Sequence, residues 1–270
     1  MEQQYIVKAI DAALKAGEAI LSIYDDPASD FQIERKADNS PLTIADRKAH
    51  RVISSMLADT PYPVLSEEGR SIPYKERSGW ESLWIVDPLD GTKEFIKRNG
   101  EFTVNIAWVS GSVPRMGVIY VPVKRVLYFA DEALGAYKLE NVTSREGATL
   151  EELTARAVKL PSDKGHEGYV VVASRSHLTP ETEQFVAEAR SMFPCVEMIS
   201  SGSSIKMCLV AEGTADVYPR FAPTMEWDTA AGHAIVRAAG GEIYRTDVNE
   251  PLRYNKENLL NPWFIVEMKN

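Results

Sequence analysis

The stretch Trp84-Ile85-Val86-Asp87-Pro88-Leu89-Asp90-Gly91-Thr92-Lys93 decides the fold and indicates the chemistry of this chain. An apolar run ending at Val86 predicts a buried strand, and two carboxylates, Asp87 and Asp90, follow it directly. Buried carboxylates are costly unless a positive charge compensates them, and hard divalent cations are the usual compensation. Gly91 and Thr92 then offer main-chain N–H groups at the start of a helix, where phosphate binds readily. The segment therefore predicts a metal site beside an anion site, a combination typical of phosphoryl chemistry.

The composition limits the range of functions. The 270 residues, 44% of them hydrophobic, can form one large domain or two modest ones. A net charge of −9 argues against a nucleic-acid groove, so an anionic substrate needs metal ions and a few local cations. Two cysteines, Cys195 and Cys208, make neither a disulfide framework nor a zinc site. Without a signal peptide or an apolar run of ~18 residues, a cytoplasmic protein with no transmembrane segment is expected. Peripheral attachment to the inner face of the cell membrane stays open.

Apolar spacing in the first half predicts helices over residues 3–24 and 42–57, with a strand at 31–36 between them. A meander of strands is expected next, at 103–109, 116–121 and 126–130.

Alternating strands and helices in the second half indicate a layered α/β arrangement. The expected strands cover residues 169–174, 195–199, 215–218 and 263–268. The expected helices cover residues 181–191, 204–212 and 229–239. The charged stretch 143–152 is expected to be a loop between domains. We therefore expect an N-terminal α+β domain at residues 1–140 and a C-terminal α/β domain at 141–270.

Three further carboxylates lie where a predicted element meets a loop, and each also has an ordinary structural explanation. Glu67 follows an apolar run but could belong to a solvated loop. Asp228 opens a predicted helix, where N-capping explains it as well as metal binding does. Asp46 lies three residues after Thr43, as in a capping box.

Taken together, the carboxylates favour metal binding. Glu67, Asp87, Asp90 and Asp228 form an oxygen-rich set that suits Mg²⁺. A zinc cluster, a Walker loop and a hydrolase serine elbow are all missing from the sequence. Phosphatases that form an aspartyl-phosphate separate their two aspartates by one residue, whereas Pro88 and Leu89 both intervene here. We therefore expect the aspartates to be ligands and not nucleophiles.

Three ordered motifs carry a resemblance to a known family: Glu67-Glu68, Asp87 to Thr92, and Trp227-Asp228-Thr229-Ala230-Ala231-Gly232. Together they resemble the inositol monophosphatase superfamily of lithium-sensitive, Mg²⁺-dependent phosphatases, over nearly the whole chain. Lys93-Glu94-Phe95 and the stretch Lys36 to Asp46 resemble its 3′(2′),5′-bisphosphate nucleotidase branch, which acts in sulfur metabolism. The resemblance implies a layered αβαβα sandwich of the inositol monophosphatase and fructose-1,6-bisphosphatase type.

The resemblance also assigns roles to residues. The metal ligands it implies, for two or three Mg²⁺ ions, are Glu67, Asp87, the carbonyl of Leu89, Asp90 and Asp228. The pair Asp46 and Thr92 is implied to orient and deprotonate the attacking water. Substrate contacts are implied for several of these residues and for others, namely Glu67, Leu89, Asp90, Gly91, Thr92, Asp228, Lys36, Ser174, His177, Gly202, Lys206 and Arg220.

Some of these substrate residues can also be read physically. Lys206 follows a Gly-Ser turn that begins a predicted helix, which suits a second anionic group. Arg220 places a cation where inositol phosphatases tend to have an acid, which favours a more anionic substrate. A surface cation remains the alternative for Lys36 and Arg220, as a solvated loop does for His177.

The expected function is hydrolysis of the 3′-phosphate of adenosine 3′,5′-bisphosphate, or of its sulfated analogue, to AMP by in-line attack of a metal-activated water. The alternatives are inositol monophosphatase or fructose-1,6-bisphosphatase activity, and a non-catalytic regulator that binds metal and nucleotide. No nucleic-acid partner is expected, and the sequence allows a monomer or a homodimer.

Overall fold

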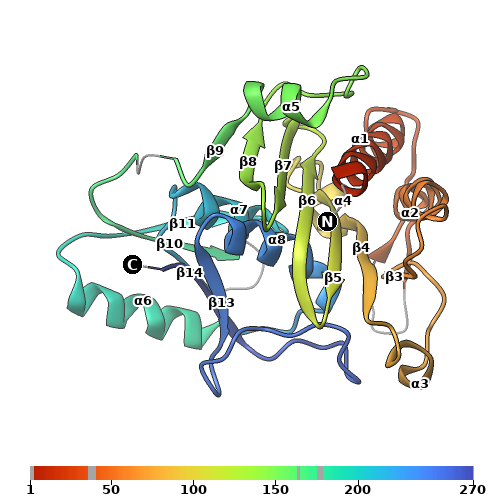
Figure 1. Cartoon of the computed structure of the whole chain (residues 1–270). Helices are drawn as coiled ribbons and strands as arrows, with labels where there is room; N and C mark the ends of the chain where they lie inside the picture. Colours follow the sequence, from red (N-terminus) through yellow and green to blue (C-terminus); the bar gives the residue numbers. More distant parts are fainter. Residues whose placement is uncertain (1–2, 36–40, 163–164, 175–178, 270) are drawn as a thin grey trace.

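The computed structural model describes residues 3–35, 41–162, 165–174 and 179–269. Helices and sheets alternate in layers: α1 and α2, a seven-stranded sheet, α7 and α8, a five-stranded sheet, and α6 (Figure 1). This is the αβαβα sandwich expected from the sequence. The bounds of these layer helices are α1 Gln3–Tyr24, α2 Ile44–Leu57, α6 Pro180–Met192, α7 Ile205–Glu212 and α8 Glu226–Ala238. The shorter helices are α3 Tyr74–Arg77, α4 Thr92–Ile96 and α5 Leu150–Arg156.

The seven-stranded sheet has the order β3-β4-β5-β6-β7-β8-β9 and is antiparallel except for the parallel pair β3 and β4. Its strands are β3 Val64–Ser66, β4 Ser82–Asp90, β5 Thr103–Ser110, β6 Val113–Val121, β7 Val126–Asp131, β8 Gly135–Leu139 and β9 Val158–Leu160. Both faces are covered, which explains why residues 83–86 of β4 are all apolar. Trp84 and Val86 pack toward α1 and α2, while Leu83 and Ile85 pack toward α7 and α8.

The five-stranded sheet has the order β11-β10-β12-β14-β13, and α6 and α7 cover opposite faces of it. Its strands are β10 Tyr169–Ser174, β11 Val196–Ser201, β12 Val217–Arg220, β13 Gly241–Arg245 and β14 Phe264–Met268. A separate two-stranded sheet pairs β1 Glu34–Arg35 with β2 Pro41–Leu42.

Helix α8 lies between the two sheets and approaches the first one closely. A Cβ atom added to Gly117 on β6 would lie 2.3 Å from the carbonyl oxygen of Ala231 on α8. On the other side, a Cβ added to Gly232 would lie 2.6 Å from the side chain of Met207 on α7. The small residues Ala230, Ala231 and Gly232 are therefore needed for packing, and the same helix carries Asp228 at its start.

The structure confirms most of the elements expected from the sequence and corrects three. Residues 31–36 do not form one strand, because Phe31 and Gln32 have positive φ angles of 60° and 45° and only β1 remains. The stretch 143–152 is not all loop, since Thr149 and Glu152 make a capping box that starts α5. Helix α8 begins at Glu226 rather than at residue 229.

The seven-stranded sheet ends with β9, beyond residue 140, and α8 packs on that same sheet. The division into domains 1–140 and 141–270 therefore stays a prediction. Within the described ranges, no helix is long and apolar enough to cross a membrane.

The replacement Gly117→Ala should destabilise the protein. The added methyl group meets a main-chain carbonyl of α8, which cannot yield unless the helix moves. We expect the free energy of unfolding to fall by ~1–3 kcal/mol in urea titrations. Gly79→Ala is the matched control because nothing lies within 4 Å of its added Cβ. Equal stability of the two variants would contradict the close packing of α8.

Candidate active site

A cavity of about 310 Å³ opens where the end of β4 meets the starts of α4, α7 and α8. Most residues that the sequence assigned to the site line this cavity: Glu67, Asp90, Gly91, Thr92, Ser174, Gly202, Lys206, Arg220 and Asp228. Asp46, Asp87 and Leu89 are buried beside it and are not part of its lining. Lys36 and His177 lie outside the described residues.

The end of β4 brings both aspartates of the opening stretch to the site. The pairing of β4 with β5 shifts register between Asp87 and Asp90, so this end of the strand is irregular. Asp87 is 1% exposed, and its Oδ1 accepts a hydrogen bond of 3.0 Å from the main-chain N–H of Leu89. The irregular strand end thus folds the chain around a buried carboxylate.

The carboxylates of the site repel one another. Burial and the charges of Glu67, Asp90 and Asp228 raise the pKa of Asp87 well above its usual value. Burial, with Asp90 and Glu67, also raises the pKa of Asp228 well above its usual value. For Asp90, burial raises the pKa to about 6, although Lys206 opposes the shift. Such a cluster of oxygen donors with excess negative charge fits a divalent cation.

The carboxylates do not form a ready-made cage. Among the described residues, no group of three or more His, Cys, Asp or Glu side chains is arranged to hold a metal ion. The fit to a cation therefore rests on donor chemistry and on the electrostatic coupling of the four carboxylates. Glu67, Asp87, Asp90 and Asp228 are the side chains that would hold the metal, with the carbonyl of Leu89 beside them.

Asp90 is oriented by two neutral donors that the sequence did not reveal. Its Oδ2 accepts hydrogen bonds from the main-chain N–H of Ser204, at 2.7 Å, and from Nδ2 of Asn105, at 3.3 Å. Asn105 is held in turn, because its Oδ1 accepts from the hydroxyls of Thr103 and Ser204. The sequence did contain one signal for this role, since Asn105 is a polar residue within the otherwise mostly apolar strand expected at 103–109.

Asp46 serves two purposes with its two oxygens. Its Oδ2 accepts from the N–H and the hydroxyl of Thr43, which completes the capping box at the start of α2. Its Oδ1 accepts from the hydroxyl of Thr92 at 3.1 Å. Burial raises the pKa of Asp46, and the hydrogen bonds from both threonines oppose that shift. Capping and catalysis, which were alternatives in the sequence, are therefore compatible.

Gly91 links the two aspartates to Thr92 at the start of α4. Its φ of 90° lies in the left-handed region, which favours glycine. A Cβ there would also lie 3.2 Å from the carbonyl oxygen of Glu101. Glycine is therefore required by both conformation and space.

Asp228 is the third residue of α8 and not its N-cap. Its Oδ2 accepts a hydrogen bond of 2.8 Å from the main-chain N–H of Met225. Within the described part of the chain, neither Oδ1 of Asp228 nor Oδ1 of Asp90 accepts a hydrogen bond. One oxygen of each carboxylate is therefore left for another ligand.

The two cations that line the cavity, Lys206 and Arg220, differ in how far their hydrogen-bond donors are already used. Lys206 is 4% exposed, and its ammonium donates to the carbonyls of Ser201 and Ser203. Burial lowers its pKa to about 8, although Asp90 opposes the shift. Arg220 is partly exposed and donates to the carbonyl of Pro223 at 3.2 Å, while its buried Nε has no hydrogen-bond partner among the described residues. Lys206 thus holds the 201–204 loop, and Arg220 has a donor to spare at the cavity.

Gly202 permits that loop to lie against the first half of the chain. A Cβ on Gly202 would lie 2.8 Å from the carbonyl oxygen of Glu101, whose side chain accepts from the Gly202 N–H at 2.9 Å. The cavity is also lined by Tyr218, which the sequence did not suggest.

The chain is similar to several known proteins over almost its whole length. The model described as the inositol monophosphatase family matches residues 1–264. A protein of Escherichia coli strain K12, named 3′(2′),5′-bisphosphate nucleotidase CysQ, is 44% identical over 259 residues, which cover 95% of this chain and 96% of the relative. The crystal structure of CysQ from Bacteroides thetaiotaomicron, called a bacterial member of the inositol monophosphatase family, superposes with a TM-score of 0.93. It is 64% identical and covers 100% of this chain and 99% of its own. The extragenic suppressor protein suhB from Bartonella henselae is 25% identical with a TM-score of 0.75, covering 98% and 94% of the two chains.

The raised pKa of Asp90 gives a pH dependence with a definite sign. Folded protein keeps the Asp90 proton up to about pH 6, whereas the unfolded chain loses it near the usual pKa of 3.8. Between these values the folded state binds more protons, so the contribution of Asp90 to the free energy of unfolding falls as pH rises from about 4 to about 6. The stability of the wild type relative to Asp90→Asn should therefore fall over this range, in urea titrations with chelator present. A difference that is constant or rises with pH would contradict the assignment.

Proposed function

The chain belongs to the inositol monophosphatase family, and on this basis we propose that it is a Mg²⁺-dependent 3′(2′),5′-bisphosphate nucleotidase. Its proposed reaction removes the 3′-phosphate of adenosine 3′,5′-bisphosphate and leaves AMP. The observation that carries the proposal is the group of four mutually repelling carboxylates beside the Thr92–Asp46 hydrogen bond.

The proposed mechanism assigns separate tasks to the residues of the site. Glu67, Asp87, Asp90 and Asp228 would hold the metal. When bound, Mg²⁺ would lower the pKa of a coordinated water and neutralise phosphate charge. The hydroxyl of Thr92 donates a hydrogen bond to Asp46, so Thr92 would take a proton from the attacking water as it passes its own proton to the Asp46 carboxylate.

The phosphate being transferred would lie at the start of α4. The main-chain N–H groups of Gly91 and Thr92 are placed to donate to it, because the first turn of a helix has N–H groups without partners in the helix. The left-handed Gly91 keeps this turn open, since it carries no side chain. We therefore expect direct in-line attack by water, with no covalent enzyme intermediate.

The cations of the cavity favour a substrate that carries a second phosphate. Arg220 and Lys206 both line the cavity, so it offers cations to a second anionic group. An inositol monophosphate has no second phosphate to use them. The name of the Escherichia coli relative supports the same substrate class.

Two other functions have less support. Inositol monophosphatase or fructose-1,6-bisphosphatase activity would use the same metal site. A non-catalytic regulator would have no need of the water-activating pair, yet Asp46 and Thr92 are both present and hydrogen-bonded. A cytoplasmic location and a monomeric or dimeric state remain predictions.

Phosphate release with Mg²⁺ tests the proposal. We expect initial rates on adenosine 3′,5′-bisphosphate to exceed those on inositol 1-phosphate, which lacks a second phosphate, and those on fructose 1,6-bisphosphate, which lacks a nucleoside. Added Li⁺ or removal of Mg²⁺ with chelator should suppress the rate. Equal or faster turnover of inositol 1-phosphate would reject the nucleotidase assignment and leave the metal site intact.

Removing the Thr92 hydroxyl should slow the chemical step without loss of metal. We expect Thr92→Ala to lower kcat by about 10²–10⁴-fold, the usual contribution of a general base. Thr92→Ser keeps the hydroxyl and is the matched control, with kcat close to that of the wild type. Mg²⁺ affinity, measured by calorimetry, should be similar in both variants. If Thr92→Ala turned over substrate as fast as Thr92→Ser, the pair would not activate the water.

A further inference from the structure

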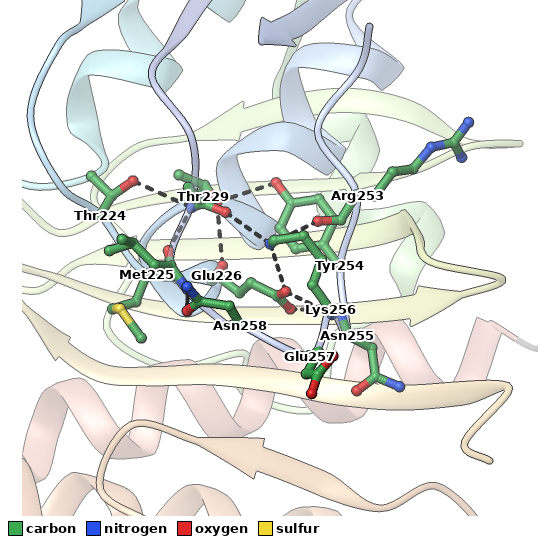
Figure 2. Close-up of polar contacts among 12 residues, drawn as sticks. Thr224, Met225, Glu226, Thr229, Arg253, Tyr254, Asn255, Lys256, Glu257 and Asn258 are labelled. Atoms are coloured by element: carbon green, nitrogen blue, oxygen red, sulfur yellow. Dashed lines mark hydrogen bonds and ion pairs between the residues drawn. The ribbon is translucent and has the colours of Figure 1, made fainter. Parts of the chain in front are cut away.

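The segment Arg253–Asn261 lies across the start of α8, where Asp228 is located (Figure 2). The main-chain N–H of Glu226 donates to the carbonyl of Leu259 at 3.0 Å, and Met225 forms an antiparallel bridge with Leu260. The first turn of α8 is thus bound by a segment about thirty residues further along the chain.

A buried ion pair joins this segment to the helix. Glu226 is completely buried, and its Oε1 lies 2.6 Å from the ammonium of Lys256. Its carboxylate also accepts from the main-chain N–H groups of Asn255, at 2.6 Å, and Lys256, at 2.9 Å. Figure 2 shows Lys256 directed at Glu226 over the helix start. The carboxylate of Glu226 is therefore removed from water and paired with the partly exposed ammonium of Lys256.

Lys256 and Asn261 extend the pairing into a network. The ammonium of Lys256 also donates to the carbonyl of Arg253, at 3.0 Å, and to Oδ1 of Asn261, at 3.3 Å. Nδ2 of Asn261 donates to the carbonyl of Met225 at 2.8 Å and to the hydroxyl of Thr229 at 3.0 Å. We call Glu226, Lys256 and Asn261 the α8 clamp.

Stability alone does not explain such a clamp. Burying two charges costs about as much as their attraction returns, and well-packed apolar residues often stabilise a protein more. A fully satisfied polar network instead fixes one geometry, because every alternative leaves a buried charge or donor without a partner. The expected benefit of the clamp is therefore precision of position.

The clamp acts where precision matters for the site. Glu226 is two residues before Asp228. Met225 contacts both the site and the clamp, because its N–H donates to Asp228 and its carbonyl accepts from Asn261. The cavity wall also includes Thr224 and Thr229, and the hydroxyls of both accept hydrogen bonds from Asn261.

The same segment is attached to the chain that follows Glu67. The guanidinium of Arg77, in α3, donates to Oδ1 of Asn255 at 3.0 Å and to the carbonyl of Glu257 at 2.8 Å. Nδ2 of Asn255 donates back to the carbonyl of Arg77 at 2.8 Å. The segment thus bridges two parts of the chain that each supply a carboxylate to the site.

We propose that Glu226, Lys256 and Asn261 are positioning residues that fix Asp228 for metal binding, so that the α8 clamp sets the affinity of the site for divalent cations. The proposal rests on the proposed metal site but not on the identity of the substrate. It predicts an effect on cation binding that is separate from the effect on global stability.

The test measures Mg²⁺ binding by calorimetry without substrate, together with thermal unfolding. We expect Lys256→Met to weaken Mg²⁺ binding by about 10- to 100-fold, as loss of an outer contact to a metal ligand does. The Mg²⁺ concentration for half-maximal phosphate release should rise in parallel, while the rate at saturating Mg²⁺ stays near the wild-type rate.

The double variant Glu226→Gln/Lys256→Met separates the effect of the clamp on Mg²⁺ affinity from its effect on the stability of the protein. It leaves no unpaired buried charge, so its melting temperature should recover relative to Lys256→Met. Its Mg²⁺ affinity should stay low, because the bond from Lys256 to Asn261 is still missing. This variant also keeps the test possible if Lys256→Met fails to fold. Recovery of Mg²⁺ affinity together with stability would overturn the proposal.

Lys138→Met is the matched control. Lys138 pairs with Glu212 at 3.1 Å, and its side chain is 21% exposed against 27% for Lys256. The Lys138→Met replacement should lower the melting temperature without changing Mg²⁺ affinity. Equal losses of affinity in Lys138→Met and Lys256→Met would reject the clamp. A wild-type protein that binds no Mg²⁺ would overturn the proposed function as well, whereas slow nucleotide hydrolysis with normal Mg²⁺ binding would leave the clamp standing.

Discussion

The repulsion among four clustered carboxylates, of which Asp87 is fully buried, is the constraint on which the rest of this structure depends. Glu67, Asp87, Asp90 and Asp228 come from three separate segments, and each raises the cost of burying another. The protein holds Asp87, Asp90 and Asp228 in place mainly with neutral N–H donors, which orient a carboxylate without cancelling its charge. An attraction for divalent cations is the direct result, because neutral donors leave the negative charge in excess.

Helix α8 delivers one of these carboxylates across the interior of the molecule, and its packing explains the sequence around Asp228. Small residues follow the aspartate because the helix lies against Gly117 on one side and Met207 on the other. Larger residues would push the helix away from the sheet and move its first turn with it. Motifs of this kind therefore combine two requirements, a ligand at the helix start and close packing one turn later.

The sequence predicted the layered fold and most of the residues that meet at the cavity, because both depend on local patterns. The apolar strand before Asp87 and the capping box at Thr43 are examples, and both are read from neighbouring residues. The supporting contacts could not be predicted, since they join residues far apart in the chain. Asn105 meets Asp90 only through strand pairing, and Lys256 reaches Glu226 only after the final segment has folded back. Lys206 was correctly placed at the cavity, but its contact with two loop carbonyls required the three-dimensional arrangement.

In the proposed mechanism, the double use of Asp46 makes the start of α2 a part of the catalytic apparatus. Helix ends open with less free energy than whole domains require, so the first turn of α2 can fray while the sheets remain intact. When that turn opens, Thr43 releases Asp46, and Thr92 loses the acceptor that directs its proton. Under mild denaturing conditions the enzyme would then become inactive by local melting, well before it unfolds as a whole.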